Sequence, residues 1–209
     1  MYLFDMSKYP KKEKKKMNMV RILGSTAHSS DEREELDFYA TDPNSLNMFL
    51  DTIKKDGVSI NKNVWENACG DGALSNALKK RGYNVLSSDI VQRGCADFTM
   101  DFTIKAPIMQ FLGDIVTNPP YKHATTFIRN SIQSVAAGSK VIMFLRLQFV
   151  EGKARKALFN EFPPKYIYVH SSRQNTYKGG THNNKSSAVC FAWFIWENGW
   201  TGDTTLRWI

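Results

Sequence analysis

Hydrophobic and polar residues alternate with two different periods along residues 37–209, and the period changes from one segment to the next. Helical spacing of apolar residues predicts four helices, which begin near residues 43, 74, 123 and 153. Short apolar runs between them predict strands, which lie near residue 64 and at residues 84–88, 115–117, 140–147, 166–169 and 188–196. Strands that alternate with helices predict an α/β fold, in which helices cover both faces of a mostly parallel sheet.

Local signals mark the ends of several of these elements. Pro43 stands near the first helical position, where its missing N–H is not needed. Gly82 closes the second helix and Gly138 stops the third. The run at residues 140–147 is so apolar that we expect both faces of this strand to be buried. Residues 171–187 are rich in Ser, Asn, Gly, Thr and Lys, which predicts a long mobile loop.

The distribution of charge divides the chain into two parts. We expect a basic, flexible N-terminal arm and linker over residues 1–36, followed by a single domain over residues 37–209. Six lysines against two acids in the first sixteen residues supply half of the net charge of +8. Such an arm is typical of contact with a polyanion, although a solvated, disordered tail has the same composition.

Composition excludes several classes of protein. A hydrophobic content of 42% and a charged content of 23% are ordinary for a soluble globular protein. We expect no membrane helix, because no apolar run approaches about 18 residues, and we expect no signal peptide, because a lysine-rich stretch follows Phe4. The three cysteines are odd in number and lack the spacing of metal ligands. They predict reduced thiols in a cytoplasmic protein without a bound metal.

The most specific chemical signal is the tetrapeptide Asn118-Pro119-Pro120-Tyr121, which follows the apolar run over residues 114–117. Two consecutive prolines fix φ twice and remove two N–H donors, so they predict a rigid turn at the end of a strand. Such a turn holds Asn118 beside Tyr121 in a fixed geometry. The amide oxygen and a neighbouring carbonyl can accept the two hydrogens of an amino group, while the tyrosine stacks on a ring. This pattern predicts a grip on the exocyclic amine of a nucleobase.

A second signal lies earlier in the chain. Gly70-Asp71-Gly72 follows Glu66 at the end of one strand and precedes a helix, so its backbone can approach a ligand closely. The next strand ends in Asp89, and an acid at that position binds ribose hydroxyls in nucleotide-binding α/β sheets. Together these residues predict a nucleoside-containing cofactor. Both turns follow the carboxyl ends of strands, where ligands bind in such sheets, so we expect them to line one crevice.

These motifs, in this order, resemble those of S-adenosylmethionine-dependent amino-methyltransferases, above all the small phage-type DNA adenine N6-methyltransferases. The matching segments are residues 37–43, 66–72, Asp89, Asp101-Phe102 and residues 118–121. The resemblance implies a Rossmann-like sheet of seven strands whose last strand is antiparallel. It also implies a cytoplasmic phage or bacterial enzyme that uses S-adenosylmethionine, with residues 37–209 as the catalytic domain.

The resemblance assigns roles to individual residues. The implied cofactor contacts are Tyr39, Thr41, Pro43, Glu66, Gly70, Gly72, Asp89, Asp101 and Phe102. Thr41 and Pro43 would hold the methionine end, Asp89 the ribose, and Asp101 with Phe102 the adenine. Asp97-Phe98 is an alternative adenine-binding pair; we favour Asp101-Phe102 because its distance from Asn118 resembles the family more closely.

The substrate side is assigned in the same way. Asn118, Pro119 and Tyr121 are the implied catalytic residues, and further substrate contacts are expected from Pro120, Lys122, Arg146 and Gln148. Structural hydrogen bonding is an equal alternative for Arg146 and Gln148, and plain exposure is one for Lys122.

The chain departs from the family at two points. Asn67 follows the motif glutamate, where the family often has proline, and no large recognition domain fits between Asp101 and Asn118. If the protein recognises a DNA sequence, the contacts would then come from the basic arm, from residues 171–187 and from the segment after Tyr121.

Several substrates share the chemistry of this turn. The leading interpretation is methylation of adenine N6 in DNA, with nucleic acid favoured over protein by the basic charge. Methylation of an RNA base amine, of cytosine N4 or of a glutamine side-chain amide are the alternatives. A non-catalytic nucleic-acid-binding protein that kept the fold is a further alternative. The sequence leaves the recognition sequence and the oligomeric state open.

Overall fold

The structure is a computed structural model that describes residues 39–104, 110–174, 176–178 and 189–209. The predicted basic arm at residues 1–36 lies outside the described residues, as does much of the predicted loop at residues 171–187. Within the described part of the chain, no helix has the length and apolarity needed to cross a membrane.

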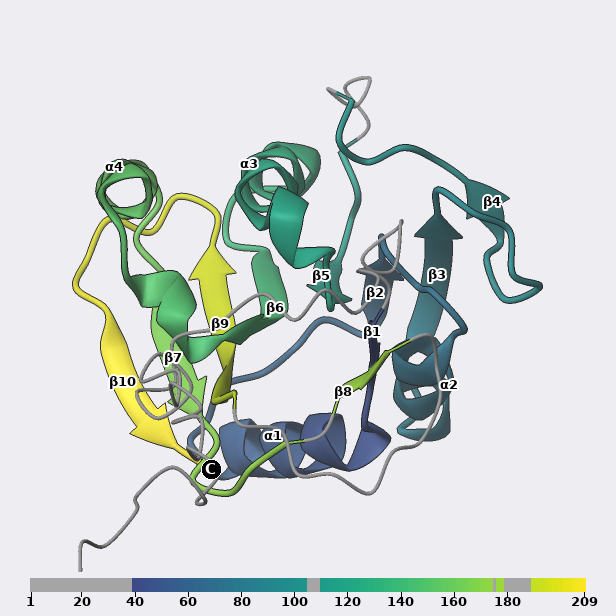
Figure 1. The fold of residues 1–209 in the computed structure, drawn as a ribbon, viewed down its shortest axis with the longest axis horizontal. Helices are drawn as coiled ribbons and strands as arrows, with labels where there is room; N and C mark the ends of the chain where they lie inside the picture. Colours follow the sequence, from purple (N-terminus) through teal and green to yellow (C-terminus); the bar gives the residue numbers. More distant parts are fainter. Residues whose placement is uncertain (1–38, 105–109, 175, 179–188) are drawn as a thin grey trace, which may run out of the picture. The chain divides into compact units, whose positions relative to one another are not determined.

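The described residues form one large sheet, with the strand order β10-β7-β9-β6-β5-β2-β3-β4 (Figure 1). The strands are β2 (Asn63–Glu66), β3 (Asn84–Asp89), β4 (Phe98–Thr99), β5 (Asp114–Thr117), β6 (Lys140–Arg146), β7 (Tyr166–Val169), β9 (Phe191–Glu197) and β10 (Thr205–Trp208). Strand β9 is antiparallel to its neighbours β6 and β7, and every other pair is parallel. The predicted α/β class with a mostly parallel sheet is confirmed. Strand β10 was not predicted and adds an eighth strand at the edge.

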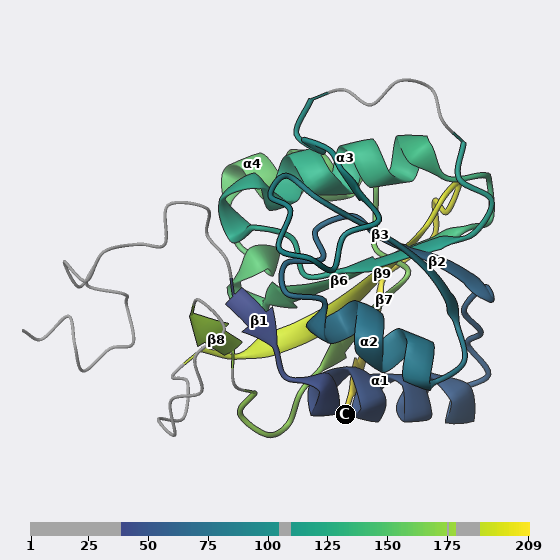
Figure 2. The ribbon, with the colours of Figure 1, turned by 90° about the vertical axis from the view of Figure 1, so that its right-hand side faces the viewer.

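Four helices cover the sheet in two pairs (Figure 2). The first pair, on one face, is α1 (Pro43–Lys55) and α2 (Ala73–Lys80), and the second pair, on the other face, is α3 (Ala124–Ser134) and α4 (Lys153–Glu161). The predicted helix starts are confirmed to within one residue. At the first of them Asp42 caps α1, because its carboxylate accepts a hydrogen bond from the Asn44 amide at 2.9 Å.

Helix α3 is shorter than predicted at both ends. A 3-10 turn over Tyr121–His123 precedes it, and it ends at Ser134 rather than continuing to Ala137. The cause of the early end is tertiary: Val135 is extended and bridges to Phe111, whose amide donates to the Ser134 carbonyl at 2.6 Å.

The core consists of two layers, one on each face of the sheet, and β6 contributes to both. Val141, Met143 and Leu145 pack with α3 and α4, whereas Ile142 and Phe144 pack with α1 and α2. All five are fully buried, which confirms the prediction from the apolar run. Each such side chain contributes roughly 1.5–3 kcal/mol through removal from water, so β6 is firmly fixed to both layers.

A small second sheet was not predicted. Strand β1 (Tyr39–Thr41) pairs antiparallel with β8 (Thr176–Lys178), with Thr41 opposite Thr176. Strand β8 lies inside the stretch expected to be a loop. Pairing across more than 130 residues leaves no local signal, so composition alone indicated a loop here.

Asp114 ties three segments together and offers a test of the sheet. It is 2% exposed, and its two carboxylate oxygens accept from the Asn61 and Lys140 amides at 2.7 Å each.

Asp114→Asn should lower the free energy of unfolding by roughly 2–4 kcal/mol, because an amide NH2 replaces one acceptor and faces a donor. Urea denaturation measures this. Asp203→Asn, at an exposed position, should change little, and equal stability of the two variants would contradict this role.

Candidate active site

A cavity of about 240 Å³ opens at the carboxyl ends of β2, β3 and β5. The predicted residues that line it are Thr41, Glu66, Gly70, Asp89, Asp101, Phe102, Asn118, Pro119, Pro120, Tyr121 and Lys122. The turn after β2 and the turn after β5 therefore meet in one cavity. This follows from parallel pairing, which brings the ends of neighbouring strands to the same edge of the sheet.

Other predicted residues lie outside the lining. Pro43 begins α1, Arg146 and Gln148 lie at and just after the end of β6, and the side chain of Tyr39 is outside the described part. Gly72 is the N-cap of α2 with a φ of +80°, and a Cβ there would lie 2.9 Å from the Cβ of Cys95. Its missing side chain therefore makes room for Cys95 rather than for a ligand.

The turn after β2 is bound directly to the end of β3. The Gly70 amide donates to one oxygen of Asp89 at 2.8 Å, and the other oxygen accepts from the Val91 amide at 3.0 Å. Arg93 forms an ion pair with the same carboxylate at 3.1 Å. These contacts fix the carboxylate at the cavity wall.

Glu66 has a different character from Asp89. It is 2% exposed and accepts a hydrogen bond from the hydroxyl of Ser75 on α2. Burial raises the pKa of its carboxyl to about 8, despite the opposing effect of the Ser75 hydrogen bonds. At neutral pH Glu66 is therefore mostly a neutral acid that anchors α2 to β2.

The structure separates the two candidate adenine-binding pairs. Asp101 and Phe102 line the cavity, and hydrogen bonds from the Thr103 hydroxyl at 2.6 Å and its amide at 2.9 Å lower the pKa of Asp101. Asp97 instead accepts from the Ser87 amide at 2.7 Å and does not line the cavity. Of the two pairs, only Asp101 and Phe102 therefore lie at the cavity.

The turn after β5 is rigid. Pro120 is the N-cap of the 3-10 turn, and its carbonyl accepts from the His123 amide at 2.8 Å. Tyr121 packs between two neighbouring strands: its ring centroid lies 4.8 Å from the guanidinium carbon of Arg146 and 6.2 Å from the ring of Phe191. Arg146 therefore reaches this turn through the tyrosine although it does not line the cavity.

Sequence reasoning missed several cavity residues. They are Ala73, Leu74, Ile90, Arg93, Met100, Thr103, His123 and Phe127. Ile90 had a usable signal, because it is an apolar residue directly after the strand-ending acid. Arg93 and Phe127 had no such signal, since it is the tertiary fold rather than a local sequence pattern that places them at the cavity.

No family model matches the chain, and no curated protein matches it in sequence. Solved structures do match. A candidate class I S-adenosylmethionine-dependent methyltransferase of Listeria monocytogenes aligns with a TM-score of 0.57 at 12% identity, over 81% of this chain and 65% of that one. A candidate RNA methyltransferase of Pyrococcus horikoshii aligns with a TM-score of 0.57 at 14% identity, over 86% of this chain and 96% of that one.

A third match is to part of a larger protein. The type IIG restriction endonuclease BpuSI aligns with a TM-score of 0.56 at 15% identity, over 78% of this chain and 26% of that one. At these identities the likeness establishes the fold. The chain has the Rossmann-like fold of class I methyltransferases, with the antiparallel β9 inserted between β6 and β7.

The neutral state of Glu66 predicts a pH-dependent stability. Between pH 4.5, the ordinary pKa, and about 8, the folded chain keeps a proton that the unfolded chain has released. The free energy of unfolding should therefore fall as pH rises through this range, by at most about 5 kcal/mol. Glu66→Gln keeps an acceptor for Ser75 and should lack this contribution.

Urea midpoints measured at pH 5, 6, 7 and 8 test this prediction. Glu151→Gln, at an exposed position, is the matched control and should follow the parent protein. The assignment fails if Glu66→Gln shows the same slope of stability against pH as the parent.

Proposed function

We propose that this protein transfers a methyl group from S-adenosylmethionine to the exocyclic amine of a nucleobase, with adenine N6 in DNA as the substrate. The observation that carries the proposal is that the turn at residues 118–121 and the turn at residues 70–72, tied to Asp89, meet at one cavity. The turn at residues 118–121 would hold the amine of the substrate, and the turn at residues 70–72 would hold the nucleoside part of the cofactor.

The cavity suits this cofactor chemically. Asp89 offers a fixed carboxylate for ribose hydroxyls, and Asp101 with Phe102 offers an acceptor and an apolar face for adenine. At the other end Thr41 is 3% exposed, and its buried hydroxyl has no hydrogen-bond partner among the described residues. A polar methionine end would satisfy it. When bound, the cofactor supplies an electrophilic methyl group.

The turn at residues 118–121 would orient the accepting amine. An aromatic amine is a weak nucleophile because its lone pair is delocalised into the ring. Hydrogen bonds from its two N–H groups to the Asn118 side chain and the Pro119 carbonyl favour a tetrahedral nitrogen whose lone pair is free to attack. This is catalysis by orientation and electrostatic stabilisation, and the rigidity of the turn means that little reorganisation is needed.

Tyr121 would replace the stacking partners of the base. A base within a duplex reaches such a cavity only after it is extruded from the stack. Tyr121 lines the cavity, and the guanidinium of Arg146 packs over its ring, 4.8 Å from the centroid. Such a supported aromatic side chain provides a fixed stacking surface.

Charge and likeness support a nucleic acid as the substrate. The chain has a net charge of +8, and two structural neighbours are described as a candidate RNA methyltransferase and a restriction endonuclease. The catalytic domain would span residues 37–209, and contacts that read sequence would come from the arm and from residues 171–187. RNA is the second candidate, since the Pyrococcus protein aligns over nearly its whole length.

A transfer assay tests the proposal directly. The protein is incubated with S-adenosylmethionine labelled in its methyl group and, separately, with duplex DNA, single-stranded DNA, RNA and a cell lysate, and the modified nucleoside is identified. We expect N6-methyladenine in DNA. Label in RNA, in N4-methylcytosine or only in protein would replace this substrate by the corresponding alternative. Cofactor binding without any transfer would indicate a non-catalytic protein.

Asn118→Ala should abolish most of the activity without loss of the cofactor site. We expect kcat to fall by roughly 10²–10³-fold, as on removal of one stabilising group from a preorganised site. The dissociation constant for S-adenosylmethionine, measured by calorimetry, should change little. Asn44→Ala, at an exposed position on α1, is the control. Full activity of Asn118→Ala would refute the role of the turn.

A further inference from the structure

Arg146 occupies a distinctive place at the end of β6. This strand is the neighbour of β5, so Arg146 lies on the same edge of the sheet as the turn at residues 118–121. Its guanidinium carbon lies 4.8 Å from the ring centroid of Tyr121. The side chain is thus a charged group packed on the aromatic ring that faces the cavity.

The hydrogen bonding of this guanidinium is incomplete. The Nε atom is buried and has no partner among the residues that the structure describes. Arg81, Arg93, Arg129 and Arg207 each form an ion pair with a carboxylate, whereas no described carboxylate pairs with Arg146. Buried donors are nearly always satisfied in native proteins, so this N–H indicates a bound acceptor.

The geometry selects the kind of acceptor. A guanidinium presents a planar fork of donors that matches two oxygens of one anion, and it is the side chain best suited to bidentate binding of phosphate or carboxylate. The guanidinium packs on Tyr121, which lines the cavity where the proposed function places a nucleotide. Each nucleotide of a nucleic acid carries a phosphate a few bonds away from its base, so a phosphodiester is the anion that arrives with the substrate.

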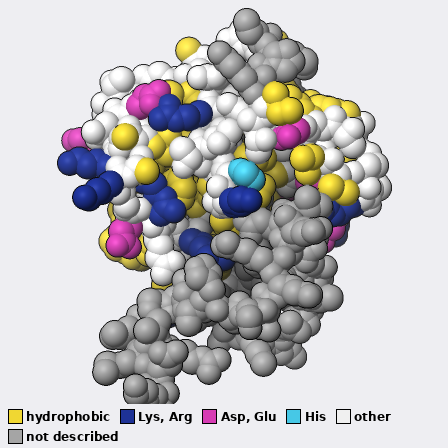
Figure 3. Space-filling model, turned by 45° about the horizontal axis from the view of Figure 1, so that its top comes forward, with side chains coloured by type: hydrophobic (Ala, Val, Ile, Leu, Met, Phe, Trp, Pro, Cys, Tyr) yellow, Lys and Arg dark blue, Asp and Glu magenta, His cyan; other side chains and the backbone are white. Residues whose placement is uncertain are grey.

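Basic residues follow Arg146 at the start of α4, after the acidic Glu151. Arg155 in α4 donates to the carbonyls of Gln148 at 3.0 Å and Glu151 at 2.9 Å, which ties the helix to the 3-10 turn Leu147–Val150. Its guanidinium stacks on Phe149 at 4.6 Å. Lys153 is exposed beyond it, and the face drawn in Figure 3 carries several Lys and Arg side chains around apolar ones.

We propose that Arg146 binds a phosphate that flanks the target nucleotide. Because the same guanidinium packs on Tyr121, binding of the phosphate also fixes the ring on which the extruded base stacks. Arg146 is therefore both a binding residue and a positioning residue. The inference rests on the proposed function, since it requires a nucleic acid in the cavity.

Two substitutions separate the two roles. Arg146→Gln removes charge and fork, whereas Arg146→Lys keeps the charge but loses the planar group that stacks on Tyr121. Arg146→Gln should raise KM for the nucleic acid about tenfold and reduce by about 1 the slope of log KM against log salt concentration. Arg146→Lys should keep the parent slope and lower kcat.

The decisive experiment neutralises single phosphates in the substrate. Oligonucleotides that the parent protein methylates are made with one methylphosphonate linkage at each position near the target base. At one flanking position the parent protein should lose about tenfold in kcat/KM, whereas Arg146→Gln should lose nothing further there. Loss at the other positions should be the same for both proteins.

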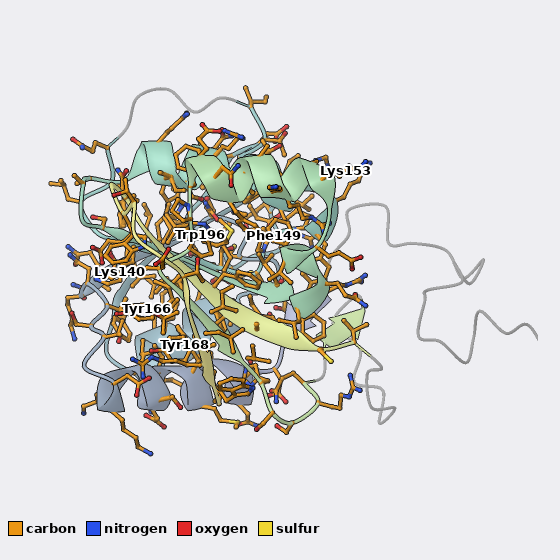
Figure 4. All side chains as sticks on the ribbon, turned by 90° about the vertical axis from the view of Figure 1, so that its left-hand side faces the viewer. Lys140, Phe149, Lys153, Tyr166, Tyr168 and Trp196 are labelled. Carbon is orange, nitrogen blue, oxygen red and sulfur yellow. The ribbon has the colours of Figure 1, made fainter. Side chains whose placement is uncertain are left out.

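Lys140→Gln is the matched control, because Lys140 begins the same strand and Figure 4 shows it on the opposite side from Phe149 and Lys153. It should keep the parent profile. The proposal is overturned if Arg146→Gln remains as sensitive as the parent protein to every methylphosphonate, or if its salt dependence is unchanged. Failure of the proposed function looks different, because the parent protein would then transfer no methyl group to any oligonucleotide.

Discussion

The site depends on the junction between the turn after β2 and the end of β3. The Cys69 amide donates to the Ser88 carbonyl at 3.0 Å there, and the Gly70 amide donates to the carboxylate of Asp89. These bonds join the two segments into one wall, and the remaining carboxylate oxygen accepts from the Val91 amide and pairs with Arg93. The rest of the cavity is built outward from this wall: β5 pairs with the other side of β2 and so brings the turn at residue 118 opposite to it.

Much of the fold and of the cavity could be predicted, because short local segments of the sequence determine the helix ends, the strands and the two turns. Pro43, Gly82 and the run of residues 140–147 each carry a local signal, and the two turns follow apolar strands whose parallel pairing was inferred from their alternation with helices. Gly70 and Asp89 were predicted to line one crevice, and they line one cavity and are hydrogen-bonded to each other. The pair at residues 101–102 was preferred over the pair at 97–98, and only the former lines the cavity.

The features that could not be predicted depend on contacts between distant segments. β1 and β8 pair across more than 130 residues, and β10 joins the edge of the sheet through β7 alone. Gly72 carries the same local signal as Gly70, yet its space is taken by Cys95, which approaches from another turn. Glu66 lines the cavity, as expected for a residue of the cofactor turn, but its raised pKa and its hydrogen bond from Ser75 on α2 depend on packing and were not predicted. Arg146 contacts Tyr121 only because β6 lies next to β5.

The pairing of β1 with β8 has a thermodynamic consequence. Thr41 lines the cavity and is also the last residue of β1, where it stands opposite Thr176. A molecule that binds more tightly when these strands are paired, and a second molecule that contacts Thr41 only in that state, must strengthen each other's binding by the same factor. Such a pair of molecules would couple the segment that follows β7 to the cavity through β1. Because the two binding steps close one thermodynamic cycle, the coupling free energy is the same whichever molecule binds first.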